Sequence, residues 1–574
     1  MESENRQCQN CKKDFTIEPE DFNFYEKIKV SPPTFCPECR TVRRLCWRNE
    51  MTLFKRQCNA PKHNEMMISF YPLEEKLVVY DNKYWWGDDW DAAYYGCDYD
   101  FSKSFFQQWK ELFQSCPMQA LSNSNAVNSN YCHVALDSRN SYMSSGSWKI
   151  EQTFYSNRIS EIKDSSDLYV VYKSELCYEC IICSDCFHLL YSINCKNCVD
   201  SYLLYDCNGC INCFGCTNLR NKSYCVWNKQ LSKKEYEEYF KKLDLKSYKT
   251  ILELKEKFKK LYLNSLHRFA VQIKTINSTG DNLRGTKNCK ICFDANGNVE
   301  DSKYSHWLAK DTKDAYDSGP GIALVELVYE IFDTGDGNFR NFFTSVVYSS
   351  NEIEYAFNCH GCSNLFGCIG VKNKKYCILN KQYTKDEYEQ LIPKIKQHMM
   401  DMPYVDKKGR IYKYGEFFPV ELSPFCYNET QAQDYFTLTK EKAIEMGYRW
   451  REEKSNEYEI TMKAENLPDN FDDVQNSITK EVIGCLHKKE CQDRCKGAYK
   501  ITEEEFNLYK RLKIPLPRLC FSCRHDERLR KRNPMKLWHR KCMKEGCQNE
   551  FETSYAPDRP EIVYCEKCYQ QEVY

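Results

Sequence analysis

The sequence has no excess of charge of either sign. Of its 574 residues, 82 are Lys or Arg and 82 are Asp or Glu, so the formal net charge is zero. A neutral chain has no overall attraction to nucleic acid or to an anionic membrane. Any electrostatic binding surface must therefore be local.

Long apolar segments are missing as well. No run of about 18 apolar residues occurs, and the opening stretch MESENRQCQNCKKDF contains no apolar segment typical of a signal peptide. We therefore expect a soluble, cytoplasmic protein with no membrane partner. In that reducing compartment the 36 cysteines are expected to be metal ligands or small core residues rather than disulfides.

Catalytic motifs that can be recognised from sequence are also lacking. There is no Gly-rich phosphate loop, no GxSxG and no HExxH, and the 10 histidines are not paired with carboxylates at catalytic spacing. Because active sites assemble in space rather than in sequence, an enzyme stays open as a less favoured alternative.

What is present is a duplication of the two ends. Residues 11–51 align without a gap with residues 495–535, at a constant offset of 484. The register continues beyond these segments, where Tyr71 and Val79 fall on Tyr555 and Val563. We infer that the two ends are copies of one module.

The modules contain paired cysteines at spacings typical of zinc sites, where four N or S ligands form a tetrahedron. The predicted ligand sets are Cys8, Cys11, Cys36 and Cys39; Cys491, Cys495, Cys520 and Cys523; and Cys542, Cys547, Cys565 and Cys568. Three zinc ions per chain are therefore expected. The spacing leaves open whether Cys485 or His487 replaces Cys491 as a ligand.

A fourth set is incomplete. Cys58 and His63 fall on Cys542 and Cys547, but Asp81 and Tyr84 stand where the C-terminal copy has its last cysteine pair. We interpret Cys58, His63 and Asp81 as the remnant of a metal site. A three-ligand zinc with an open position can be catalytic, but the duplication favours decay here.

Basic residues follow the cysteines closest to the centre of each module. Arg40, Arg44 and Arg48, like Arg524, Arg528 and Arg532, recur at every fourth position and would line one face of a helix. Such a cationic stripe suits phosphate contacts, and RNA is the favoured partner. The candidate nucleic-acid contacts are Arg40, Arg44, Arg48, Arg524, Arg528, Arg530, Lys531, Arg532 and Arg540. Alternatively, the stripes pair with acidic residues elsewhere in the chain.

A second duplication occupies the middle, where residues 207–236 match residues 359–388 at an offset of 152. Short apolar, Cys-rich bursts alternate with Asn, Asp, Ser and Gly, and in the first copy Cys pairs recur with a step of 12. This pattern predicts a parallel β-solenoid with about half a coil in 12 residues. Its repeats could serve as a protein-interaction scaffold, the main alternative to nucleic-acid binding.

The Cys-rich runs of the first repeat also have the spacing of an iron–sulfur signature. The runs are Cys177, Cys180, Cys183 and Cys186, and Cys207, Cys210, Cys213 and Cys216. In the second repeat Val328 and Leu365 stand in place of Cys177 and Cys213. Because a cluster ligand would not be replaced by an aliphatic residue, we favour buried free cysteines and keep the iron–sulfur reading as the weaker alternative.

These patterns predict a multidomain, mainly β protein with some α structure, in which zinc-ribbon or treble-clef modules flank two helix-capped repeats. The expected order is a module at 1–84, an aromatic and acidic segment with an amphipathic helix at 85–125, repeat 1 at 126–230, a helical connector at 231–272, repeat 2 at 273–383, a helix at 384–402, a linker at 403–480 and the module copy at 481–574.

The first module resembles the zinc-ribbon (treble-clef) domain family through CQNCKKDFTIEPEDFNFYEKIKVSPPTFCPECRTVRR. Cys8, Cys11, Phe15, Phe24, Tyr25, Cys36, Cys39 and Arg40 carry this resemblance. The whole chain is similar to large cysteine-rich, zinc-ribbon-bearing proteins of candidate-phyla bacteria, through DDWDAAYYGCDYDFSKSFF, FGCTNLRNKSYC, YGEFFPVELSPFCYNET and APDRPEIVYCEKCY. The resemblance implies a fold and bound metal rather than a reaction.

Overall fold

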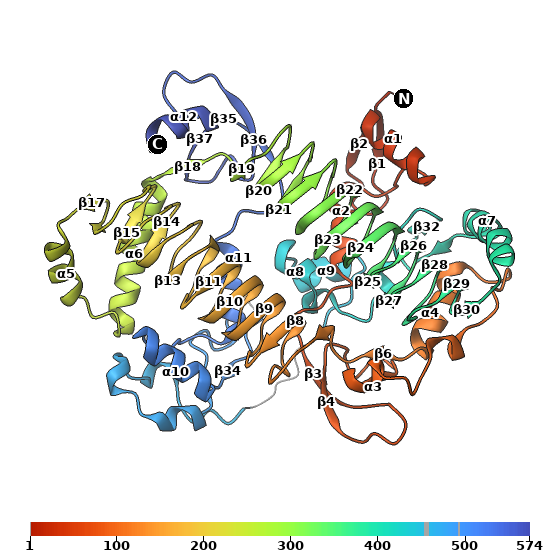
Figure 1. Ribbon diagram of the computed structural model, residues 1–574, viewed down its shortest axis with the longest axis horizontal. Helices are drawn as coiled ribbons and strands as arrows, with labels where there is room; N and C mark the ends of the chain where they lie inside the picture. The colour runs from red at the N-terminus through yellow and green to blue at the C-terminus, as the bar shows by residue number, and fades with distance from the viewer. Residues whose placement is uncertain (1, 453–457, 492–493) are drawn as a thin grey trace. The chain divides into compact units, whose positions relative to one another are not determined.

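The computed structural model describes residues 2–452, 458–491 and 494–574 and divides the chain into two compact units (Figure 1). Unit 1 consists of Met1–Leu121, Ala270–Glu452 and Met535–Leu537, and unit 2 of Ser122–Phe269, Glu453–Pro534 and Trp538–Tyr574. The N-terminal module therefore belongs with the second repeat, and most of the C-terminal module with the first. Neither module belongs with the repeat nearest to it in sequence.

In unit 2 the first repeat forms a sheet that we call the first strand stack. Its strands are β7 (Asn123–Ser124), β8 (His133–Arg139), β9 (Ser145–Phe154), β10 (Asn157–Ser166), β11 (Tyr169–Glu175), β12 (Ile181–Ser184), β13 (Phe187–Leu190), β14 (Val199–Tyr205), β15 (Phe214–Thr217), β16 (Cys225–Val226) and β17 (Lys229–Gln230). All pairings are parallel except the final β16–β17 hairpin.

Hydrogen-bonded neighbours in this stack lie 12 residues apart, as in Ser145 with Asn157 and Tyr202 with Phe214. The expectation that 12 residues make half a coil is therefore wrong, because 12 residues already lead to the next hydrogen-bonded strand.

In unit 1 the second repeat forms the second strand stack. Its strands are β19 (Gln272–Ile273), β20 (Gly280–Lys287), β21 (Cys292–Glu300), β22 (Leu308–Tyr316), β23 (Ile322–Tyr329), β24 (Phe332–Phe342), β25 (Ser345–Tyr348), β26 (Asn351–Glu354), β27 (Phe357–His360), β28 (Ser363–Phe366), β29 (Lys375–Ile378) and β30 (Lys381–Gln382). The step between paired residues is mostly 12, but β-bulges lengthen it, as between Leu308 and Ile322.

The chain turns at every third residue through the left-handed region. Leu176, Glu179, Ile182 and Asp185 have φ angles of 55°, 48°, 55° and 57°. This conformation is costly for most side chains and is tolerated best by Gly, Asn and Asp, which explains why the repeats are rich in these residues.

The residue after each of these corners points into the core of the stack. Cys177, Cys180, Cys183 and Cys186 occupy four such positions in succession and are buried. Their thiols lie near main-chain carbonyls, with Cys180 Sγ 3.1 Å from the Leu189 oxygen. The CxxCxxCxxC spacing thus follows the three-residue period of a narrow core that holds small side chains, as the favoured interpretation expected.

The two modules have matching elements. The N-terminal module contains β1 (Glu4–Gln7), β2 (Asp14–Ile17), α1 (Pro19–Ile28), α2 (Pro37–Leu45), β3 (Phe54–Gln57), β4 (Met66–Ser69), β5 (Val79–Tyr80) and α3 (Asn82–Trp86). The C-terminal module contains β33 (Ile483–Gly484), β34 (Ala498–Tyr499), α10 (Glu503–Leu512), α11 (Phe521–Arg530), β35 (Trp538–Lys541), β36 (Glu550–Thr553), β37 (Ile562–Tyr564) and α12 (Glu566–Val573). Adding 484 to the bounds of α1, β3 and β4 gives those of α10, β35 and β36.

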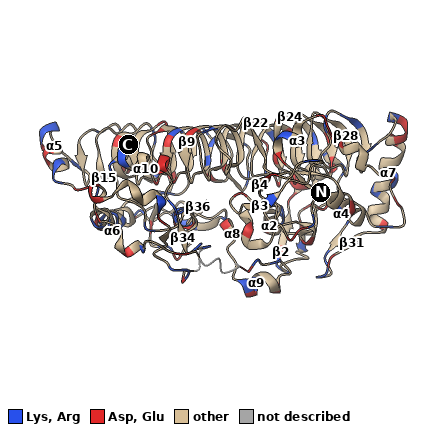
Figure 2. Ribbon diagram, turned by 90° about the horizontal axis from the view of Figure 1, so that it is seen from below, with Lys and Arg blue, Asp and Glu red and all other residues tan. Residues whose placement is uncertain are grey.

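Helices flank the stacks in both units. They are α4 (Phe105–Ser115), α5 (Lys233–Lys241), α6 (Tyr248–Asn264) and α7 (Lys385–Asp401). The predicted capping boxes are formed at Ser232 of α5 and Thr384 of α7. Both helices carry charges of both signs (Figure 2). Phe105, Trp109 and Phe113 of α4 are buried, which confirms that this apolar face is core.

The segment expected to be a linker, 403–480, instead contributes to both units. Tyr412, Phe417 and Phe418 are buried in the core of unit 1, and Phe471 and Ile478 in that of unit 2. Its elements are β31 (Tyr404–Val405), β32 (Ile411–Tyr412), η2 (Val420–Leu422), η3 (Tyr427–Glu429), α8 (Gln431–Tyr435), α9 (Lys440–Glu445), η4 (Ala464–Asn466), η5 (Phe471–Asp473) and η6 (Asn476–Lys480).

The remaining short elements join neighbouring parts of each unit. They are η1 (Ala92–Tyr95), β6 (Met118–Gln119), which pairs with β5, and β18 (Leu266–Arg268), which pairs with β37. Among the helices of the described residues, none combines the length and the apolar character needed to cross a bilayer.

Candidate metal centres and the arginine clamps

The first cysteine tetrad lies in unit 1 and consists of Cys8, Cys11, Cys36 and Cys39, whose sulfur atoms all lie within 4.8 Å of one another. Cys8 ends strand β1, and Cys36 caps the N-terminus of α2. The Cys36 amide donates to Cys8 Sγ at 3.3 Å, and the Cys8 amide donates to the Lys13 carbonyl at 2.9 Å. The backbone thus fixes the thiols before any ion is considered, and the four positions predicted from sequence are brought together.

The second tetrad, in unit 2, corrects the prediction. It consists of Cys485, Cys495, Cys520 and Cys523, so Cys485 takes the place given to Cys491. The Cys520 amide donates to Cys485 Sγ at 3.3 Å, and the Cys485 amide donates to the Gly497 carbonyl at 2.8 Å. These bonds repeat those of Cys8 at equivalent positions.

Sequence spacing missed Cys485 because the loop to the second cysteine is seven residues longer than in the N-terminal copy. A usable signal was the Ile483–Gly484 pair, which forms the strand before Cys485 as β1 does before Cys8. Cys491 and His487 form a separate group with Cys523, and the Cys491 and Cys523 sulfurs are 3.8 Å apart.

The third tetrad also lies in unit 2 and consists of Cys542, Cys547, Cys565 and Cys568, as predicted. The Cys565 amide donates to Cys542 Sγ at 3.3 Å, the same backbone bond as in the other two tetrads.

The incomplete set is gathered in unit 1, where Cys58, His63 and Asp81 bring their donor atoms within 4.8 Å of one another. The Asp81 amide donates to Cys58 Sγ at 3.3 Å, as Cys565 does to Cys542. His63 Nδ1 lies 3.2 Å from Asp81 Oδ2 and 2.9 Å from Glu65 Oε1. The geometry of a knuckle therefore persists although two of its four cysteines are replaced.

In unit 1 the arginines behind the first tetrad are buried against the second strand stack. Arg40 Nε lies 2.9 Å from Asp317 Oδ1, and Arg44 Nη1 lies 3.7 Å from the same oxygen. Arg43 binds Glu330 and Glu416, both at 2.6 Å. All of these side chains are almost completely buried. We call the pairing of two arginines with one aspartate the arginine clamp.

The clamp is repeated in unit 2. Arg524 Nη1 lies 2.6 Å from Asp167 Oδ2, and Arg528 pairs with the other oxygen of that carboxylate. Flanking contacts are duplicated too. Tyr155 donates to Glu505 at 2.9 Å, as Tyr304 donates to Asp21 at 3.0 Å. The rings of Tyr178 and Tyr509 meet edge to face, as do those of Tyr25 and Tyr329.

These contacts overturn part of the nucleic-acid prediction. Arg40, Arg44, Arg48, Arg524 and Arg528 are buried beside carboxylates, so they cannot reach a phosphate backbone. The remaining predicted contacts are exposed or half-buried; they are Arg530, Lys531, Arg532 and Arg540. Arg532 donates to the Tyr169 hydroxyl at 3.1 Å, and Arg540 to the Ala556 carbonyl at 3.2 Å.

The acidic partners are the functional residues that sequence reasoning did not find. Asp167, Asp317 and Glu330 lie hundreds of residues from their arginines, so no local pattern links them. The paired stretches ELCYE (175–179) and ELVYE (326–330) do mark equivalent places in the two stacks.

No family model and no curated protein matches the chain. A solved structure from Desulfovibrio desulfuricans G20, described as a "putative acetyltransferase", aligns over 51% of this chain and 86% of its own, with 10% identity and a TM-score of 0.10. A likeness at that level carries no argument about fold or function.

Proposed function

We propose that this protein is a non-enzymatic, zinc-stabilised scaffold. Four thiolates without a water or an open position are typical of structural zinc, and all-sulfur donors favour zinc over harder cations. Three tetrads predict three zinc ions per chain, held by the residues that the structure gathers: Cys8, Cys11, Cys36 and Cys39; Cys485, Cys495, Cys520 and Cys523; and Cys542, Cys547, Cys565 and Cys568.

The observation that carries the proposal is the arginine clamp directly behind a cysteine knuckle in both units. Cys39 and Arg40 are adjacent, as are Cys523 and Arg524. A metal that fixes the first turn of α2 or α11 would therefore also fix the clamp on its strand stack. We interpret the stacks, with their 12-residue steps, as the coils of a β-solenoid and the modules as the metal-held braces of those coils.

A protein partner is favoured over RNA because the charges needed for phosphate contacts are used inside the fold. The first stack also displays apolar side chains in register, with Phe187, Val199 and Ile211 paired at successive steps. Phe187 and Ile211 are 42% and 43% exposed. Such a row suits a protein partner better than a nucleic acid.

The metal experiment is elemental analysis of protein purified without oxygen. Three zinc ions per chain are expected, and Cys36→Ser and Cys520→Ser should each reduce the content to two. Cys97→Ser, at an exposed cysteine outside the tetrads, is the control and should retain three. Iron in the purified protein, or zinc unchanged in the tetrad variants, would contradict the proposal.

RNA and DNA affinity measured across salt concentrations distinguishes the two classes of partner. The scaffold proposal expects no salt-dependent binding that depends on α11. If wild type binds RNA and replacement of Arg530, Lys531 and Arg532 by Gln weakens that binding and reduces its salt dependence, nucleic-acid binding takes the place of the scaffold proposal.

A further inference from the structure

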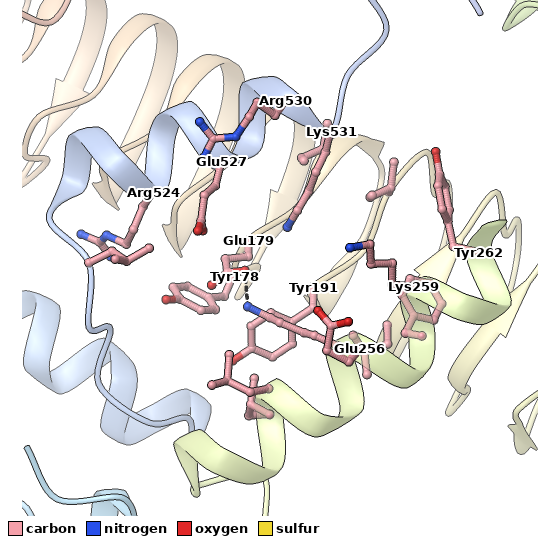
Figure 3. A pocket seen from close by; sticks show the side chains of 18 of the residues that line it. Tyr178, Glu179, Tyr191, Glu256, Lys259, Tyr262, Arg524, Glu527, Arg530 and Lys531 are labelled. Carbon is pink, nitrogen blue, oxygen red and sulfur yellow. Dashed lines mark hydrogen bonds and ion pairs between the residues drawn. The ribbon is translucent and has the colours of Figure 1, made fainter. Parts of the chain in front are cut away.

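Unit 2 contains a cavity of about 590 Å³ between α11, α6 and the first strand stack (Figure 3). Cavities of this size typically hold a small organic molecule. Glu527, Arg530 and Lys531 line one side and Glu256, Lys259 and Tyr262 the facing side, with Tyr178, Glu179 and Tyr191 behind them. The metal tetrads and the exposed row of the stack are separate features, so nothing proposed so far accounts for the cavity.

The charge of the lining is predominantly basic, with seven Lys or Arg against four Glu. Most of these charges have partners within the fold. Lys255 pairs with Glu179 at 2.6 Å, Arg559 with Glu561, and Arg524 with the clamp aspartate. Lys259 and Lys531 differ, because neither forms a hydrogen bond or ion pair with any other residue that the structure describes.

Figure 3 shows the side chains of Lys259 and Lys531 reaching into the cavity from opposite helices. Desolvation by the surrounding protein lowers the pKa of Lys531, an effect that the nearby carboxylates do not fully offset. An anion placed between the two ammonium groups would supply the missing counter-charge.

The duplication provides an internal comparison. The residue of unit 1 equivalent to Lys531 is Trp47, which is 2% exposed and packs against Trp109 and Phe418. Where unit 1 has the buried ion pair of Arg43 and Glu330, unit 2 has two carboxylates, Glu527 and Glu179.

Unit 2 therefore carries polar and charged groups where its copy carries a stable apolar and ion-paired core. Burial and then the proximity of Glu179 raise the pKa of Glu527, so unit 2 gains no stability from this exchange. Sites that give up stability in this way are typical of ligand binding.

An apolar wall completes the site. Ile251 and Leu252 of α6 and the Pro515–Pro517 segment face the cavity. A ligand that uses both walls needs a compact anionic head and an apolar body. Inorganic ions would satisfy only the lysines.

We propose that this cavity binds a small organic anion, with its phosphate or carboxylate group between Lys259 and Lys531 and its apolar body against α6 and the Pro515–Pro517 segment.

The test is isothermal titration calorimetry of the full chain with phenyl phosphate, benzoate and inorganic phosphate. Phenyl phosphate or benzoate should bind, and the tighter of the two identifies the head group. Lys259→Gln and Lys531→Gln should each weaken binding at least tenfold. Lys260→Gln, at the next exposed lysine of α6, lies outside the lining and should leave binding unchanged.

Lys531→Trp copies the N-terminal module and keeps the proposal testable if the glutamine variants fold poorly. It should abolish binding while the midpoint of urea unfolding is kept or raised. No binding of either organic probe to wild type, equal affinity in wild type and Lys531→Gln, or inorganic phosphate binding as tightly as phenyl phosphate would overturn the proposal.

Discussion

At the scale of single residues, the aspartates of the arginine clamps are the most consequential groups in the molecule. Asp317 and Asp167 are each fully buried and each faces two guanidinium groups. A buried ion pair adds little net stability compared with apolar residues, but loss of one partner leaves a charge without compensation.

Asp317→Ala should therefore destabilise unit 1 by about 3–5 kcal/mol, because it strands Arg40 and Arg44 in the core. Asp314→Ala is the matched control, since Asp314 pairs with the half-exposed Lys27 and should cost less than about 1 kcal/mol. Urea unfolding measures both. Equal losses in the two variants would contradict the role of the clamp.

The incomplete site offers a constructive test. Asp81 and Tyr84 occupy the places of Cys565 and Cys568, and the backbone bond to Cys58 Sγ is already formed. Asp81→Cys and Tyr84→Cys together should complete a site with Cys58 and His63 and raise tightly bound zinc from three to four per chain. Elemental analysis after passage over a chelating resin measures this. Zinc that stays at three would show that the knuckle is no longer competent.

One buried histidine predicts the response to acid. Burial lowers the pKa of His267 to about 4, even though Glu561 and the Ser265 carbonyl favour its charged form. Between pH 6.5 and 4 the unfolded chain binds a proton that the folded chain does not. Stability should therefore fall by about 3 kcal/mol as the pH decreases across that range.

His267→Gln should remove this part of the pH dependence, whatever its effect on stability at neutral pH. His539 is exposed, so His539→Gln should leave the pH dependence as it is in wild type. Urea unfolding at several pH values checks both variants. A pH profile unchanged in His267→Gln would refute the assignment.

At the scale of elements, the sequence predicted some features well and others poorly, for physical reasons. The duplicated modules, the capped helices α5 and α7 and the buried face of α4 all depend on local patterns, and the structure contains each of them. The strand step was misjudged because a chain that turns at every third residue has neither the period of a helix nor that of an ordinary strand.

Features that depend on distant contacts could not be predicted. Cys491 was chosen over Cys485 because spacing alone cannot register a longer loop. The stripes of Arg40 and Arg524 looked solvent-facing because their aspartates lie in another part of the chain. The cavity was equally invisible, since Lys259 and Lys531 come together only when α6 meets α11.

The left-handed corners give an element-scale prediction. Asn212 has a φ of 52°, a conformation that a β-branched side chain adopts only with strain. Asn212→Val should destabilise the first stack by about 1–2 kcal/mol, whereas Asn212→Gly should be nearly neutral. Thermal unfolding of the two variants measures the difference. If Val and Gly behave alike, the corner does not constrain the stack.

At the scale of the whole molecule, each unit joins segments from both ends of the chain. A cut between residues 269 and 270 would leave a module and a stack on each fragment, but not a module and stack that belong together. Neither fragment alone should protect its clamp aspartate, and mixing the fragments should restore both units. Hydrogen exchange measures this protection. Full protection in one isolated fragment would contradict the crossed arrangement.

The crossed arrangement also has a consequence for synthesis on the ribosome. Asp167 emerges more than 350 residues before Arg524 and Arg528, whereas unit 1 can close once residue 452 has been made. The first stack must therefore persist in the nascent chain with an uncompensated carboxylate on the face that the last module will cover. Translation itself would impose an order of assembly, unit 1 first and unit 2 last, and metal delivery would have to follow that order.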